Sequence, residues 1–324
     1  MADTPYTLHP FTARATNGIR NCVVTAGCFD GVHRGHRHLL DQVAAEARRR
    51  GCPAVVMTFD RHPREVLQKG YQPALLTTTD DRVALLRQTG MDACAVLHFT
   101  SEMARLTAAA FMKEILVQGL GASTLVMGYD HRFGSDHLTA FADYAAATAQ
   151  TGMDIVHATP LMIGGEAVSS SRIRRQLAAG DAAGAAACLG RPFALPGRVV
   201  HGNHVGTGIG FPTANVKADD DRLMVPAHGV YAAWAQTEDG RQHAAMVNIG
   251  VRPTIGDGLL PTTEAHLLHF DGDLYGRHLT LHFVTRLRDE RRFTSRDDLR
   301  AQLSEDARTA RMALDEATAN KIEQ

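Results

Sequence analysis

The sequence predicts two parts: an α/β domain with a parallel sheet, followed by a small antiparallel β-barrel with a C-terminal helix. Its 324 residues suffice for two domains of roughly 100–200 residues each. Short apolar segments alternate with amphipathic helical segments in the first half, whereas β-type segments follow one another in the second half. This change of pattern places the boundary at residue 188 and gives domains of 1–188 and 189–324.

The first half contains five short segments that we expect to be strands. They are apolar throughout rather than alternately apolar and polar, which is typical of parallel strands covered on both faces. The expected strands are 22–26, 54–59, 93–98, 123–128 and 154–158. The helices expected between them are 35–50, 80–88, 107–117 and 141–150. Strands that alternate with helices predict a parallel sheet with helices on its faces.

The first domain ends with an Ala-rich helical stretch at 170–188, and a short connector follows at 189–193. Five β-type segments separated by turns follow the connector. They are 195–202, 228–236, 244–250, 264–270 and 278–284. A long amphipathic helix is expected only at 295–319. Several strands followed by one helix predict a small barrel with a helix packed beside it.

Composition limits the kinds of partner that the chain can have. The formal net charge is −1, from 34 Lys and Arg against 35 Asp and Glu, so no global field attracts nucleic acid or a membrane surface. The 5 cysteines are odd in number and none are at C-x-x-C spacing, which indicates a reducing compartment. The first twenty residues lack the apolar core of a signal peptide, and no run approaches a membrane span. We expect a cytoplasmic protein with small-molecule substrates, and leave homo-oligomerisation open.

The decapeptide GCFDGVHRGH, residues 27–36, is the first candidate site. It follows an expected strand and opens an expected helix, which is where parallel sheets bind ligands. Gly27 and Gly35 let the backbone approach a ligand, and His33 and His36 are spaced to share one face of the first helical turn. Imidazoles at a helix N-terminus can donate hydrogen bonds to phosphate oxygens. A metal pair is the alternative, but no third ligand accompanies it, and the G-x-x-x-x-G-K-[ST] pattern of a P-loop is absent.

The segment VSSSRIRR, residues 168–175, is a second helix start with anion-binding side chains. Ser170 and Ser171 offer hydroxyl groups, and Arg174 can reach a phosphate from the first turn. Alone, a Ser-rich cap with basic residues is commonplace. Together with the first motif, it resembles the nucleotidylyltransferase superfamily, in which two helix starts embrace the triphosphate of ATP. That resemblance implies a Rossmann-like parallel sheet for the first domain.

Further motifs narrow the resemblance and extend it from about residue 20 to residue 308. They are TFDRHPREVL (58–67), GYDHRFG (128–134), GFPTAN (210–215), HGVY (228–231), NIGVRPT (248–254) and TEAHLLHF (263–270). In this order the set resembles the bacterial bifunctional riboflavin kinase/FMN adenylyltransferases, or FAD synthetases. The resemblance implies that the C-terminal domain converts riboflavin and ATP to FMN and ADP. It implies that the N-terminal domain converts FMN and ATP to FAD and pyrophosphate.

For the adenylyltransferase half, the resemblance assigns His33, His36 and Arg174 as catalytic residues. It places a further set at the nucleotide and the flavin. These are Gly27, Phe29, Asp30, Gly35, Asp60, His62, Gly128, Asp130, Arg132, Phe133, Ser170 and Ser171. Alternatives stay open within this set: the two aspartates can be strand-end turn residues, His62 can brace its loop, and Phe133 can be core. Because the phosphate of FMN itself attacks ATP, we expect no covalent enzyme intermediate.

For the kinase half, the resemblance assigns Glu264 as the general base for the ribityl 5′-hydroxyl. Thr213 and Asn215 are oxygen donors suited to Mg²⁺, with Mn²⁺ as an alternative. Residues expected at the nucleotide or flavin are Gly202, Gly206, Gly210, Asn248 and Arg252. Arg288 either positions substrate or braces the terminal helix. Two rival interpretations remain, namely a chain active in one half only and a sensor that binds flavin or nucleotide without chemistry.

Overall fold

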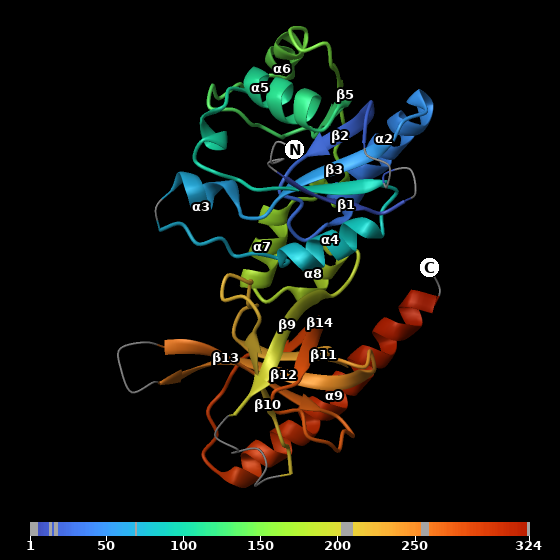
Figure 1. Cartoon of the computed structure of the whole chain (residues 1–324). Helices are drawn as coiled ribbons and strands as arrows, with labels where there is room; N and C mark the ends of the chain where they lie inside the picture. The colour runs from blue at the N-terminus through green and yellow to red at the C-terminus, as the bar shows by residue number, and fades with distance from the viewer. Residues whose placement is uncertain are drawn as a thin grey trace. The chain divides into compact units, whose positions relative to one another are not determined.

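The computed structural model describes residues 6–12, 15, 19–68, 70–201, 210–253 and 259–322. The chain divides into two compact units, Met1–Ser169 and Ser170–Gln324. Figure 1 shows the parallel-sheet elements of the first unit and the barrel strands of the second. Each unit is therefore described by itself.

The first unit is built on a six-stranded sheet with the order β1-β4-β3-β2-β5-β6. Strands β2 to β6 are parallel to their neighbours, as the apolar segments predict. Their bounds are β2 Cys22–Ala26, β3 Ala54–Phe59, β4 Ala93–Leu97, β5 Ala122–Met127 and β6 Asp154–His157. The edge strand β1, Tyr6–Pro10, pairs with β4 in the antiparallel sense and was not among the predicted strands.

Helices connect these strands and cover the sheet. Their bounds are α2 Arg34–Arg50, α3 Pro63–Leu67, α4 Thr79–Arg87, α5 Ala108–Ala110, η2 Phe111–Gly119 and α6 Phe141–Thr148, with short η1 at Met103–Arg105. The single helix predicted at 107–117 is thus α5 running into the wider turns of η2, and Thr107 accepts the Ala110 N–H as its cap. The two-residue strands β7, Met162–Ile163, and β8, Glu166–Ala167, form a small hairpin.

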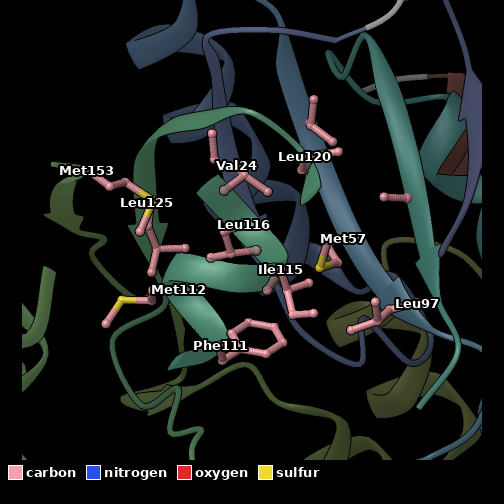
Figure 2. Close-up of a cluster of buried hydrophobic side chains, with 14 of the residues drawn as sticks. Val24, Met57, Leu97, Phe111, Met112, Ile115, Leu116, Leu120, Leu125 and Met153 are labelled. Carbon is pink, nitrogen blue, oxygen red and sulfur yellow. The ribbon is translucent and has the colours of Figure 1, made fainter. Parts of the chain in front are cut away.

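Apolar side chains on both faces of the sheet explain the unbroken apolar strands. One cluster packs the helix η2, through Met112 and Leu116, against Val24 and Leu125 of the sheet, as Figure 2 shows. The opposite cluster packs α2 against alternate strand residues. Successive residues of β2 point to opposite faces, so both clusters draw on it. The predicted parallel sheet with two covered faces is confirmed.

The second unit contains a closed barrel with the order β10-β13-β12-β11-β14-β9, in which every neighbouring pair is antiparallel. The strands are β9 Phe193–Val200, β10 Ala214–Ala218, β11 Gly229–Thr237, β12 Gln242–Pro253, β13 Leu259–Leu267 and β14 His278–Arg288. The long helix α9, Arg296–Ile322, packs Ala310 and Leu314 against Ala232 and Met246 on the outside of the barrel. The predicted barrel and terminal helix are confirmed (Figure 1).

Two helices precede the barrel in this unit, α7 Ser170–Ala178 and α8 Ala182–Leu189. The Leu177 carbonyl accepts the Ala227 N–H at 2.9 Å, and Gly180 lies against the Arg286 side chain. The compact units thus divide before α7, whereas the sequence places the boundary at residue 188, and that boundary stays a prediction. In the described part of the chain, no helix has the length and apolar character that crossing a membrane requires.

Candidate active sites

The turn that follows β2 lies where the sheet changes its direction of growth. From β2 the chain adds β3 and then β4 on one side, and afterwards returns to place β5 on the other side of β2. Ligands of open parallel sheets bind outside the carboxyl ends of the strands at such a switch point. The motif at 27–36 occupies this position, as its strand-to-helix context predicts.

His33 is the N-cap of α2 and orients the histidine pair. Its Nδ1 accepts a hydrogen bond from the His36 N–H at 3.2 Å, and the two rings stack with centroids 3.5 Å apart. Because Nδ1 is an acceptor, the proton of the neutral ring is on Nε2. His33 is 3% exposed, so its tautomer is fixed in a buried setting beside the positive end of a helix. The predicted sharing of one face by the two imidazoles is confirmed.

Gly35 allows close packing behind this pair. A Cβ at this position would lie 2.7 Å from the Val168 carbonyl oxygen and 3.1 Å from Nδ1 of His33. The helix α7 begins at Ser170, two residues after Val168, so the predicted helix start in the second motif is confirmed. The positions of its residues Ser170, Ser171 and Arg174 relative to the histidines stay a prediction.

Asp30 has the contacts of a turn brace. Its carboxylate is 2% exposed and accepts the Leu76 and Thr77 N–H groups at 2.9–3.0 Å, together with the Thr77 hydroxyl at 3.1 Å. These contacts favour the strand-end turn that the sequence left open. The neighbouring Phe29 ring lies 5.0 Å from the ring of His36, between centroids.

The two candidates after β3 also stabilise their own loop. Asp60 accepts the Phe99 N–H at 3.1 Å, and its other oxygen lies 3.3 Å from Nδ1 of His98. His62 caps α3, because its Nδ1 accepts the Arg64 N–H at 3.1 Å while its own N–H donates to Glu65 at 2.9 Å. The sequence left open that His62 braces its loop, and these two hydrogen bonds are of the kind that such a role requires.

The segment GYDHRFG follows β5 on the other side of the switch point. Gly128 begins it, Asp130 and Arg132 are exposed, and Phe133 packs partly into the core with its ring 4.9 Å from that of Tyr144. The buried Tyr144 hydroxyl accepts the Phe133 N–H at 3.0 Å and lies 3.0 Å from the Phe133 carbonyl. Tyr144 was missed at the sequence level, where the only signal is a single aromatic hydroxyl in an Ala-rich helix.

The environment of His131, in the same segment, keeps its imidazole ring neutral. Burial lowers the pKa of His131 to about 4, although the Asp130 carboxylate opposes the shift. The ring lies 5.4 Å from that of Phe133, between centroids. At neutral pH His131 therefore offers an uncharged aromatic ring, as phenylalanine would.

Strand register brings three predicted residues of the kinase half together. Asn215 of β10 pairs with Glu264 of β13, which in turn pairs with Asn248 of β12. Directly paired residues in antiparallel strands share a face, with Cβ atoms about 5 Å apart. The carboxylate is therefore flanked by two amides, although the three residues are far apart in the sequence.

Glu264 and Asn248 of this row line a cavity on the outside of the barrel. Thr263, Ala265 and Leu267 are buried, so the alternating residues Glu264 and His266 point outward. The cavity has a volume of about 260 Å³ between these strands and the segment that enters α9. Its lining includes Phe211, Thr213, Asn248, Glu264, His266, Arg288, Glu290 and Phe293. Asn215 borders a separate cavity beside β9 and β10.

Arg288 connects the terminal helix to the wall of the cavity. Its guanidinium binds the Asp306 carboxylate of α9 at 2.6 Å and 2.9 Å, and it also lines the cavity. Asp306 is 3% exposed, so this pair fixes α9 to the barrel at the cavity wall.

Part of the predicted kinase site lies outside the residues that the structure describes. Gly202 and Gly206 are outside the described residues, as is the side chain of Arg252, whose backbone lies in β12. Gly210 has φ of +84°, a conformation that suits glycine. Among the described residues no group of three or more His, Cys, Asp or Glu side chains is arranged to hold a metal ion.

Comparison with known proteins identifies the family. The FAD synthetase family model matches residues 16–172, and the riboflavin kinase family model matches residues 189–314. The bifunctional riboflavin kinase/FMN adenylyltransferase of Escherichia coli K12 is 40% identical over 290 residues, which cover 90% of this chain and 92% of the relative. The chain belongs to the bifunctional riboflavin kinase/FMN adenylyltransferases. The protein of the same name from Pseudomonas fluorescens is also 40% identical, over 299 residues covering 90% and 93% of the two chains.

Both domains of the family are present and in the family's order, so the chain makes FMN from riboflavin and then FAD from FMN, with ATP as co-substrate. A solved structure described as a macrolide-efflux protein from Streptococcus pneumoniae is 32% identical, with a TM-score of 0.82, and the match covers 90% of this chain and 94% of that chain. The predicted resemblance and the predicted two activities are confirmed.

Proposed function

We propose that the two reactions take place at the two sites described above: riboflavin phosphorylation at the row Asn215–Glu264–Asn248, and adenylyl transfer at the turn 27–36. The observation that carries the proposal is the strand register, which sets the Glu264 carboxylate between two amides, with Glu264 and Asn248 lining one cavity. The capped and stacked histidine pair supports the second assignment.

In the kinase reaction, the Glu264 carboxylate accepts the proton of the ribityl 5′-hydroxyl as that oxygen attacks the γ-phosphorus of ATP, and ADP leaves. Thr213 lies immediately before β10, and Asn215 is the second residue of that strand. Their oxygens, with the phosphates of ATP, form the hard donor set that Mg²⁺ or Mn²⁺ prefers. A bound Mg²⁺ supplies charge neutralisation on the phosphates.

In the second reaction, a phosphate oxygen of FMN attacks the α-phosphorus of ATP and pyrophosphate leaves. The Nε2–H of His33 and the ring of His36 donate hydrogen bonds to the developing negative charge at the start of α2. We assign Ser170, Ser171 and Arg174 to triphosphate binding on the ground of their motif. Catalysis is positioning and charge stabilisation, with no covalent intermediate.

Most of the remaining candidates are binding residues of these two sites. Around the adenylyltransferase turn they are Gly27, Phe29, Gly35, Gly128, Asp130, Arg132 and Phe133, and in the kinase half Gly202, Gly206, Gly210, Asn248 and Arg252. Asp30, Asp60 and His62 support the first site by holding its loops, through the contacts described above. Free thiols at all five cysteines fit a reducing compartment, and we propose that the protein acts in the cytoplasm on small molecules alone.

The test is incubation of the purified chain with riboflavin, ATP and Mg²⁺, followed by chromatography of the flavins. FMN followed by FAD is the expected result. With riboflavin supplied, His36→Ala should form FMN but little FAD. Glu264→Gln should form little FMN from riboflavin but make FAD normally when FMN is supplied. A variant that loses both FMN formation from riboflavin and FAD formation from supplied FMN to the same extent would contradict the assignment of two sites, and tight flavin binding without turnover would favour a sensor.

A further inference from the structure

The turn between β2 and α2 holds its backbone in a strained shape. Phe29 has φ of +48° and Val32 has φ of +38°, on either side of Gly31 at +82°. Residues with a Cβ rarely adopt these angles, and a β-branched valine does so least readily. Each such residue is strained and persists only where the surroundings impose it. The contacts that impose this shape are therefore part of how the turn is built.

One set of contacts comes from the segment that leads into α4. The Leu76 and Thr77 N–H groups donate to the Asp30 carboxylate, and the Gly31 N–H donates to the Thr77 hydroxyl at 3.0 Å. Asp30 and Gly31, in the middle of the strained stretch, are thus both hydrogen-bonded to the same segment. The partners lie 46 residues further along the chain.

Arg82 of α4 supplies a second hold at the entrance of the turn. Its guanidinium donates to the Cys28 carbonyl at 2.8 Å and to the Phe59 carbonyl at 2.9 Å. A third bond, at 2.9 Å, goes to the Thr79 hydroxyl of the same helix. Phe59 is the last residue of β3, and Cys28 lies two residues after the end of β2. The Arg82 side chain therefore joins the two loops that follow these strands.

The burial of Arg82 indicates that its role is to fix the positions of the two loops rather than to stabilise the fold. The residue is 6% exposed, burial lowers its pKa, and its Nε has no hydrogen-bond partner in the described structure. No described carboxylate lies within ion-pair distance of it. Buried charges without a close counter-ion contribute little net stability, because desolvation offsets the hydrogen bonds. The planar fork of arginine nevertheless holds two carbonyls in a fixed geometry through donors on separate nitrogens, which the single nitrogen of lysine does not reproduce.

We propose that Arg82 is a positioning residue for adenylyl transfer, which fixes the strained turn 27–36 to the end of β3 and thereby holds His33 and His36 in place. It acts through the Cys28 and Phe59 carbonyls and does not contact substrate. This inference rests on the proposed assignment of adenylyl transfer to the turn.

The test compares both activities in one chain, so the kinase serves as an internal reference. Arg82→Lys keeps the charge but loses the fork, and we expect kcat for FAD formation to fall about 10- to 100-fold, since a misplacement of about 1 Å costs about 10²-fold. The KM for ATP should change less than kcat, and FMN formation should be unaffected. Thr77→Val should show the same pattern. Arg87→Lys is the matched control, because Arg87 lies on the same helix and is exposed.

A chemical rescue separates positioning from a general structural role. Methylguanidinium at a non-denaturing concentration should restore FAD formation to Arg82→Ala, whereas methylammonium should not. Unchanged FAD formation in Arg82→Lys would overturn the inference, as would a parallel loss of both activities with a lowered melting temperature. A wild-type chain that forms FMN but no FAD would instead contradict the proposed function of the turn.

Discussion

Replacing Gly35 by alanine tests the packing behind the histidine pair most directly. Gly35 is helical and has no positive φ, so helix propensity alone favours alanine by about 1 kcal/mol. Packing opposes it, because the added methyl carbon would lie 2.7 Å from the Val168 carbonyl oxygen and 3.1 Å from the ring of His33. The backbone oxygen cannot rotate away as a flexible side chain would.

The size of the displacement decides which effect prevails. An ordinary contact begins at 3.4 Å, so the start of α2 and the Val168 carbonyl must separate by about 0.7 Å. That is close to the roughly 1 Å misplacement that lowers catalytic rates by about 10²-fold. We therefore expect Gly35→Ala to lower kcat for FAD formation by about 10- to 100-fold, while riboflavin kinase activity is retained.

The assay is the two-step conversion of riboflavin, followed by chromatography, with each rate measured separately. Gly51→Ala is the control: this glycine ends the same helix with φ of +68°, and a Cβ added there would meet no other atom within 4 Å. The variant should lose about 1 kcal/mol of stability through backbone strain and keep both activities. FAD formation within twofold of wild type in Gly35→Ala would refute the packing argument.

Two further predictions concern the segment after β5. Tyr144→Phe leaves the Phe133 N–H without its hydroxyl partner, so we expect a loss of about 1–3 kcal/mol of stability by denaturant titration, and a higher KM for FMN; an unchanged unfolding midpoint would contradict this. The pKa of His131 in the folded chain is lowered to about 4, against about 6.5 for an ordinary histidine. Between these two pH values the unfolded chain takes up a proton that the folded chain does not. The free energy of unfolding should therefore decrease as the pH is lowered from about 6.5 to about 4. His131→Phe should remove that part of the pH dependence of the melting temperature, and an identical pH profile would count against it.

Local pattern made the position of the adenylyltransferase turn predictable. A strand, a glycine-rich turn and a helix start follow one another within 27–36, and the structure places them at the switch point of the sheet. The same holds for Thr107 as a cap and for Ser170 as the first residue of a helix. These features depend on neighbours a few residues away, which the sequence displays directly.

Contacts between distant segments were not predictable from pattern. Nothing near Asp30 indicates that its partners are Leu76 and Thr77, and an isolated arginine in a short helix gives no sign that it reaches two strand ends. Edge strand β1 was missed for a related reason, since its pairing with β4 depends on the sheet already being in place. In the barrel, register is equally invisible, yet it is what unites Asn215, Glu264 and Asn248.

The two sites should therefore differ in their sensitivity to substitutions elsewhere in the chain. The kinase row is fixed by strand register, which many backbone hydrogen bonds determine together, so no single side chain outside the cavity should control it. The adenylyltransferase turn instead carries strain at Phe29 and Val32, and side-chain contacts from Asp30, Thr77 and Arg82 hold it in that shape. Substitutions outside the ligand sites should consequently impair FAD formation more often than FMN formation, because a strained turn loses its geometry as soon as one hold is released.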